Sequence, residues 1–263
     1  MRIALGIEYD GNAFHGWQIQ PLGGTVQDAL ESALKRISGE SIGVVCAGRT
    51  DAGVHATGQV VHFDTAVSRP LSAWVRGVNT FLPPAVAVRW VQPVDEGFHA
   101  RFSAFGRCYR YLLLNRPQRL GVWNGRAGWY HHALDEKVMQ QAANFLLGEH
   151  DFSAFRAADC QARSPIKVVR HAEVRRFGDM LVLDFEAGAF LHHMVRNMVG
   201  SLVYVGQGKH SPEWIGKLLE CGDRSLAAPT FSAAGLYLVG VRYEAHWMLP
   251  IAADPFLPGG VVL

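Results

Sequence analysis

The sequence predicts an α+β protein with two lobes built around a mixed sheet. Segments with helical spacing alternate with segments in which every second residue is apolar, and in places two strand-like segments follow each other directly. Both halves of the 263 residues have this rhythm, without a close sequence repeat. We therefore expect a first lobe over residues 1–104, a second lobe over residues 105–249 and a tail over residues 250–263.

The helix expected over residues 26–37 is the best-defined element of the first lobe. Thr25 and Asp28 form a variant of the capping box ahead of an apolar stripe with helical spacing. Glu31 and Lys35 are spaced for an i,i+4 ion pair on the open face. The other expected elements are strands over residues 2–9, 42–47, 59–63 and 86–91 and a helix over residues 71–82.

In the second lobe, residues 107–114 alternate as a strand, with Tyr109 and Tyr111 on one face and Arg110 on the other. An apolar stripe that begins at Phe190 predicts the clearest helix of the chain. The other expected elements are helices over residues 134–147 and from residue 211 onward, and strands over residues 167–175, 180–185 and 236–241.

Composition excludes some classes of protein and leaves others open. No apolar run reaches the roughly 18–20 residues of a membrane span. The four cysteines are far apart and form no C-x-x-C pair, so we expect reduced thiols in a cytoplasmic protein and neither a disulfide framework nor a zinc site. The net charge of +2 neither supports nor excludes a nucleic-acid partner.

Two segments, residues 99–111 and 151–167, interleave arginines with aromatic residues. Arginine binds phosphate oxygens in a bidentate manner and aromatic rings stack on unpaired bases, so the pattern favours single-stranded or loop RNA. The alternative, in which the aromatic rings are core and the arginines cover a surface, stays open. No P-loop, Rossmann fingerprint, G-x-S-x-G elbow or H-E-x-x-H motif is present. His192 and His193 are adjacent in the sequence, which is poor geometry for one metal ion on a helix, and we expect hydrogen-bonded or surface histidines.

The stretch GRTDAGVHATGQVVHF, Gly48 to Phe63, contains the most informative carboxylate, Asp51. Asp followed closely by Gly is typical of a turn. However, Arg49 lies two residues away and is placed to orient the carboxylate. An ordinary aspartate is already ionised at neutral pH and needs no activation to act as a nucleophile. Local chemistry alone leaves both interpretations open.

The same stretch resembles the signature of the tRNA pseudouridine synthase A family. The resemblance extends along the chain through IALGIEYDG, TVQDAL, HARFSA with RCYRY, DFSAF, FLHHMVRNMVGSL and GLYL. It implies a two-lobed α+β pseudouridine synthase fold with a mixed, largely antiparallel sheet and a basic cleft between the lobes. It also implies a homodimer that isomerises uridine to pseudouridine at positions 38, 39 and 40 of the tRNA anticodon stem-loop, without cofactor or metal.

The resemblance also assigns roles to individual residues. Asp51 matches the essential aspartate, Arg49 would pair with it, and Tyr109 would stack on the target uracil and help to remove its C5 proton. Core packing explains Tyr111 as well as substrate binding does, and strand packing similarly accounts for Leu236. The expected substrate-binding residues are Tyr109, Tyr111, Arg101, Arg156, Arg196 and Leu236.

Two positions depart from the family pattern. Gly24 and Cys108 stand where relatives often carry basic residues, and both changes are expected to weaken RNA binding modestly. Two other functions are weighed against the isomerase. A noncatalytic tRNA-binding protein would be expected to have lost Asp51 or Tyr109, and both are present. A hydrolase with Asp51 as nucleophile would need a water-activating base, for which His55 or His62 would serve.

Overall fold

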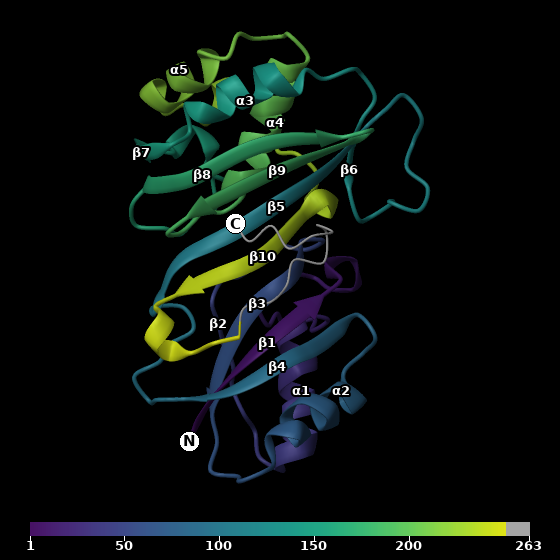
Figure 1. Ribbon diagram of the computed structural model, residues 1–263, viewed down its shortest axis with the longest axis vertical. Coiled ribbons are helices and arrows are strands. Elements are labelled where there is room, and N and C mark those ends of the chain that lie inside the picture. Colours follow the sequence, from purple (N-terminus) through teal and green to yellow (C-terminus); the bar gives the residue numbers. More distant parts are fainter. Residues whose placement is uncertain (251–263) are drawn as a thin grey trace. The chain divides into compact units, whose positions relative to one another are not determined.

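The computed structural model describes residues 1–250, which form two compact units (Figure 1). Among the described residues, the first unit comprises Met1–Arg107 and residues 237–250, and the second unit comprises Cys108–Leu236. The last described strand thus groups with the first unit from Tyr237 on, whereas we expected it in the second lobe. The expected tail lies outside the described residues except for residue 250. Within residues 1–250, no helix combines the length and the apolar character of a bilayer span.

The first unit contains a sheet with the strand order β4-β1-β3-β10 and with β2 beside β3. Strand β1 pairs antiparallel with both β3 and β4, whereas β10 pairs parallel with β3. The mixed, largely antiparallel character that we expected is therefore present in this unit. The strands are β1 (Arg2–Tyr9), β2 (Val45–Cys46), β3 (His55–Asp64), β4 (Val86–Val94) and β10 (Leu236–Tyr243).

Helix α1 (Val26–Ser38) has the cap that the sequence predicts. Thr25 Oγ1 accepts from the N–H of Asp28 at 3.2 Å, and Gly39 ends the helix in the left-handed conformation. The expected ion pair between Glu31 and Lys35 is not formed, because Glu31 instead accepts from the N–H of Val44 at 2.9 Å. The acidic side chain thereby anchors the chain that leads into β2.

The helix expected over residues 71–82 forms a π-helical turn, η2 (Ala73–Gly77), followed by α2 (Val78–Phe81). Asn79 fixes α2 against β4, because its side-chain amide exchanges two hydrogen bonds with the backbone of Val88, at 2.9 and 2.7 Å. Helices α1 and α2 pack against each other, as Figure 1 shows.

The second unit contains strands in the order β5-β9-β8-β7, with β6 parallel to β5. Strands β8 and β9 form a long antiparallel pair, and α3 packs on β8 and on α4 (Figure 1). The elements are β5 (Ala104–Asn115), β6 (Gly128–Tyr130), α3 (Glu136–Asn144), β7 (Gly148–Asp151), β8 (Ile166–Phe177), β9 (Met180–Ala187), α4 (Met194–Gly206) and α5 (Trp214–Cys221). The α+β class is thus confirmed in both units.

Strand β5 is buried on both faces, including at Arg110. The guanidinium of Arg110 has no exposed surface and binds the carboxylate of Asp184 on β9 at 2.6 and 3.2 Å. Arg175 on β8 donates to the same carboxylate at 2.5 Å. Arg110 belongs to one of the two segments for which RNA contact and a surface coat of arginines both stayed open, and its full burial against Asp184 fits neither interpretation.

Helix α4 starts at Met194, later than the apolar stripe suggested. Phe190 and Leu191 precede it in an irregular segment, although Leu191 is buried like the helix residues that follow. Apolar spacing indicates which residues are buried, so a buried loop residue next to a helix cannot be distinguished from a helix residue by this pattern. The four cysteines carry free thiols, which agrees with their spacing in the sequence.

Candidate active site

Asp51 occupies the first position of a tight turn between β2 and β3. The N–H of Val54 donates to the carbonyl of Asp51 at 3.1 Å, and Gly53 at the third position has a φ of 77°. A positive φ is strained for a residue with a Cβ and open to glycine. The turn leaves Asp51 half-buried at the entrance of β3. The sequence interpretation of Asp51 as a turn residue is therefore confirmed, and the turn itself positions the carboxylate.

Hydrogen bonds from the core hold the residues just before this turn. The hydroxyls of Tyr9 and Thr50 lie 2.8 Å apart and share a hydrogen bond. Gln59, whose side chain is fully buried, donates to the carbonyl of Gly48 at 2.6 Å. Both partners lie on strands of the sheet, so β1 and β3 fix the backbone that leads to Asp51.

A glycine supports the same turn from the other side. Gly16 has a φ of 91°, and the next N–H, that of Trp17, donates to the carbonyl of Thr50 at 3.0 Å. A Cβ added to Gly16 would lie 3.0 Å from the carbonyl oxygen of Thr50 and 3.1 Å from the nitrogen of Ala52. The loop before α1 therefore packs directly on the backbone on both sides of Asp51.

Arg49 and Arg101 are exposed on the first unit. Within residues 1–250 the guanidinium of Arg49 forms no hydrogen bond or ion pair, and its pairing with Asp51 stays a prediction. Arg101 Cζ lies 5.6 Å from the ring centre of Phe102, which is 76% exposed. The ring of His99 lies 4.3 Å from that of Phe102, and its Nδ1 accepts from the N–H groups of residues 101 and 102. This turn presents a cation and an aromatic face together.

Arg107 lies in the segment that interleaves arginines with aromatic residues, and its side chain is buried. Its Nη2 donates to the carbonyl of Ala47 at 3.0 Å and to that of Arg101 at 2.5 Å, and its Nη1 donates to the carbonyl of Ala104 at 3.0 Å. Arg107 therefore joins the turn that carries Arg101 to the start of the segment that carries Asp51. The sequence did contain one signal for this burial: Arg107 is the first residue of an expected strand whose two faces are both largely apolar.

The two histidines considered as bases for a hydrolase are both buried and engaged. His55 Nδ1 accepts from the N–H of Gly11 at 3.1 Å, and His62 Nδ1 accepts from the N–H of Ala100 at 3.1 Å. Burial and then the neighbouring His99 lower the pKa of His62 to about 4. A histidine whose ring nitrogen holds the backbone is poorly placed to activate water. The hydrolase alternative therefore loses its two candidate bases.

Tyr109 and Tyr111 occupy the same face of β5 in the second unit. The ring of Tyr109 packs edge-on against that of Phe190, with centres 5.2 Å apart. Tyr111 is fully buried and donates from its hydroxyl to the carbonyl of Ser232 at 2.8 Å. Burial raises the pKa of the Tyr111 hydroxyl well above its usual range.

Two glycines complete the packing around Tyr111. A Cβ on Gly128 would overlap its hydroxyl, and one on Gly235 would lie 2.6 Å from its ring. Since the side chain is enclosed in this way, the structure favours the core-packing alternative for Tyr111.

Arg196 and Leu236 lie next to the same loop. Arg196, in the first turn of α4, donates from Nε to the carbonyl of Phe231 at 2.8 Å, and the N–H of Phe231 donates back to the Arg196 carbonyl at 3.2 Å. Leu236 is buried at the start of β10, directly after the short helical turn Ala233–Gly235. Arg196 thus holds the loop that leads to Leu236.

Arg156 shapes the loop that follows β7. Its Nη2 donates to the carbonyls of Cys160 and Ala162 at 2.6 and 2.9 Å. In the same region His192 Nδ1 lies 2.9 Å from Asp159 Oδ1, and this hydrogen bond holds the pKa of Asp159 below its usual range. His192 is therefore hydrogen-bonded, as expected, and any contact of Arg156 with RNA stays a prediction.

His193 is a feature that the sequence did not reveal. It caps α4 with a φ of 59°, in the left-handed region that residues other than glycine rarely adopt. Such backbone outliers often mark functional positions. No sequence pattern announces a left-handed histidine at this point.

The two departures from the family pattern have different structural settings. Gly24 has a φ of 73°, so an arginine at this position would be strained in the backbone conformation found here. Cys108 is buried and its thiol donates to Glu186 at 3.3 Å.

The structure divides the expected site residues between the two units. Arg49, Asp51 and Arg101 belong to the first unit, where Arg107 and Ala47 link the segments that carry them. Tyr109, Tyr111, Arg156, Arg196 and Leu236 belong to the second unit. Within the second unit, Arg196, Tyr111 and Leu236 converge on residues 231–236, whereas Arg156 binds a separate loop.

Comparison with known proteins gives a consistent result. The sequence profile described as tRNA pseudouridine synthase matches residues 6–103 and 142–244. The chain is 67% identical over 259 residues to the tRNA pseudouridine synthase A of Dechloromonas aromatica (strain RCB), which covers 98% of this chain and 99% of the relative. It is 59% identical over 250 residues to the enzyme of the same name from Aromatoleum aromaticum, covering 95% of each chain.

A solved Cbf5–Nop10–Gar1 complex resembles the structure with a TM-score of 0.34 and 12% identity, over 76% of this chain and 45% of that chain, which is too weak to support an argument. The sequence matches, in contrast, run through both units and include the segment of Asp51. The chain therefore belongs to the tRNA pseudouridine synthase family.

Proposed function

We propose that this protein isomerises uridine to pseudouridine at positions 38, 39 and 40 of the tRNA anticodon stem-loop. The observation that carries the proposal is the 67% identity to a tRNA pseudouridine synthase A over almost the full length of both chains. The turn that presents Asp51 from a braced backbone is the structural support, because a carboxylate must be held in place to react.

In this reaction the N1–C1′ glycosidic bond breaks, the uracil turns, and C5 bonds to C1′ while the C5 proton is lost and N1 gains one. Asp51 supplies the carboxylate, which attacks C1′ or C6 or promotes loss of a sugar proton. Arg49 pairs with Asp51 and helps to hold the target nucleotide out of the stack. No atom of a cofactor or metal takes part, and the active protein is a cytoplasmic homodimer.

Tyr109 stacks on the uracil and helps to remove the C5 proton after isomerisation. Its edge-on packing against Phe190 supports this role, because a ring held on one side keeps its orientation when a base binds. Leu236 contributes to an apolar wall, while Arg101, Arg156 and Arg196 contact the RNA backbone. Of these arginines, Arg101 is the exposed one beside an exposed aromatic ring, which suits phosphate and base contact together.

The test uses unmodified tRNA transcripts. After incubation with the protein, pseudouridine is labelled with a carbodiimide and mapped by reverse-transcriptase stops. We expect stops at positions 38–40 that disappear with Asp51→Asn and persist with Glu220→Gln, an exposed carboxylate on α5. Full activity of Asp51→Asn would rule out the proposed role of this carboxylate, and absence of stops with the wild-type protein would rule out the activity.

A second comparison tests Tyr109. Tyr109→Phe is expected to lower turnover more than tRNA affinity if the hydroxyl moves a proton. Tyr204→Phe, a half-buried tyrosine on α4, serves as the control and should change neither. Equal losses of turnover and affinity in Tyr109→Phe would show that the ring only positions the base.

A further inference from the structure

The segment between β5 and α3, residues 115–132, concentrates positive charge that neither the sequence motifs nor the candidate site uses. It contains Arg116, Arg119 and Arg126, two tryptophans and two histidines, and no Asp or Glu. The whole chain has 25 basic and 23 acidic residues, so this segment is far more basic than its surroundings. It also exposes Trp123 and Trp129. Aromatic rings beside arginines are typical of nucleic-acid contact.

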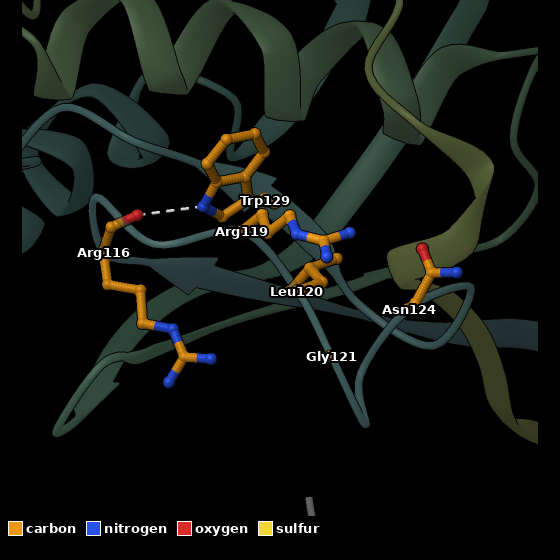
Figure 2. A pocket seen from close by; sticks show the side chains of 6 residues that line it. All are labelled: Arg116, Arg119, Leu120, Gly121, Asn124 and Trp129. Atoms are coloured by element: carbon orange, nitrogen blue, oxygen red, sulfur yellow. Dashed lines mark hydrogen bonds between the residues drawn. The ribbon is translucent and has the colours of Figure 1, made fainter.

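Part of this segment forms a hollow of about 610 Å³, which is within the range of sites that bind small organic groups. Figure 2 shows it from close by, with the Arg119 side chain running between Trp129 and Asn124 and with Arg116 on the other side. The hollow is lined by Arg116, Arg119, Leu120, Gly121, Asn124 and Trp129.

The hollow is built on a fixed frame. Trp129 lies on β6 in register with Leu114 of β5, and its indole N–H donates to the carbonyl of Arg116 at 2.9 Å (Figure 2). The N–H of Asn124 donates to the carbonyl of Gly121 at 3.0 Å and closes the loop on the opposite side. An indole held by a sheet on one side and a closed loop on the other forms a preformed site.

The arginines of the hollow retain unused donors. Within residues 1–250, Arg119 is exposed and forms no hydrogen bond or ion pair. Nη1 of Arg116 lies 3.7 Å from Oδ2 of Asp179. Nε of Arg116 is buried and has no hydrogen-bond partner within residues 1–250. A buried N–H without a partner is costly, and an anion that reaches it relieves that cost.

We propose that this hollow binds an unpaired nucleotide of the tRNA, with its base on Trp129 and its phosphate between Arg116 and Arg119. The inference rests on the proposed function, which supplies the tRNA. Along β5 and the residue after it, the seven steps from Tyr109 to Arg116 span about 24 Å at about 3.4 Å per step. One nucleotide is too short to contact both Tyr109 and the hollow. The hollow therefore engages a nucleotide other than the target, and increases affinity without taking part in the chemistry.

The test measures binding of fluorescently labelled tRNA to the full-length protein. Arg119→Ala is expected to raise the Kd about tenfold and to lower the slope of log Kd against log salt by about 1, because one phosphate contact is lost. Trp129→Ala is expected to raise the Kd by a similar factor through loss of base stacking. Arg76→Ala, which removes an exposed arginine from the first unit, is the matched control and should leave both quantities unchanged.

Two further measurements separate the possible outcomes. Turnover at saturating tRNA should stay at the wild-type value in Arg119→Ala. Wild-type affinity of Arg119→Ala for tRNA would overturn the proposal, as would a fall in turnover at saturating tRNA. Displacement of tRNA from the hollow by micromolar AMP or UMP would also overturn it, in favour of a free mononucleotide.

The outcome for the hollow is separable from the outcome for the reaction. Arg119-dependent binding of tRNA by a protein that forms no pseudouridine would contradict the proposed function and support the hollow as an RNA site. Arg119 is exposed and its guanidinium forms no hydrogen bond or ion pair with the described residues, so the variant should fold normally, and a thermal unfolding curve checks this.

Discussion

The contact between Gly16 and the backbone beside Asp51 can be tested by a single added methyl group. Gly16→Ala forces a φ of 91° on a residue with a Cβ and brings that carbon within 3.0 Å of the Thr50 carbonyl oxygen. The left-handed conformation alone costs about 1–2 kcal/mol. The short contact adds to this cost, because both atoms that the Cβ meets belong to the backbone and cannot rotate away.

The chain provides a matched control at the end of α1. Gly39 has a φ of 80°, and a Cβ added there would meet no atom within 4 Å. Gly39→Ala should therefore lose about 1–2 kcal/mol of unfolding free energy and keep full activity. The difference between the two variants isolates the contact from the backbone strain.

The expected effect of Gly16→Ala on catalysis follows from the displacement that it requires. The Thr50–Ala52 backbone must move by a few tenths of an ångström, and a misplacement of about 1 Å can cost about 100-fold in rate. We therefore expect turnover to fall about three- to tenfold with tRNA affinity nearly unchanged. Stability is measured by denaturant unfolding, and turnover by release of tritium from C5 of labelled uridine. Identical turnover in Gly16→Ala and Gly39→Ala would refute the argument that Gly16 supports the turn.

Three other predictions concern groups outside the turn. Asp184→Ala should destabilise the protein by about 3–5 kcal/mol, because it removes the carboxylate that neutralises the buried Arg110 guanidinium. The double variant Arg110→Met/Asp184→Leu should be close to neutral, and denaturant unfolding that gives the same loss for both would contradict this. His62 has a pKa of 6.5 in the unfolded chain and of about 4 in the folded chain, so the free energy of unfolding should fall as the pH drops through this window. A smaller fall in His62→Gln, measured by urea midpoints, would confirm that His62 causes it. Iodoacetamide should label the exposed Cys221 well before Cys46, since burial raises the pKa of the Cys46 thiol to about 12, and mass spectrometry that finds equal labelling in the folded protein would disprove this.

Local patterns predicted local structure well. The cap at Thr25 and the strands expected over residues 2–9 and 180–185 all depend on neighbours in the sequence or on simple alternation. The short strands β6 and β7 were not predicted, because each has few residues and is defined by the strand beside it.

The assignment of individual site residues shows where sequence reasoning fails. Arg101, Arg107 and Arg110 share one segment and one residue type, yet the first is exposed, the second binds backbone carbonyls and the third is buried against Asp184. Which of these partners an arginine finds is decided by strands far away in the sequence. The resemblance to a family assigned Asp51, whereas local chemistry alone left a turn and a catalytic role both open, and the structure shows how a turn presents that carboxylate.

The enclosure of Tyr111 has a consequence for how this protein can vary. Its hydroxyl fits against Gly128, the residue before Trp129, and its ring fits against Gly235, the residue before Leu236. One tyrosine thus acts as a spacer between the strand that carries the basic hollow and the loop that leads to Leu236. A side chain at either glycine would displace both features together, so changes on one side of the spacer are expected to require compensation on the other.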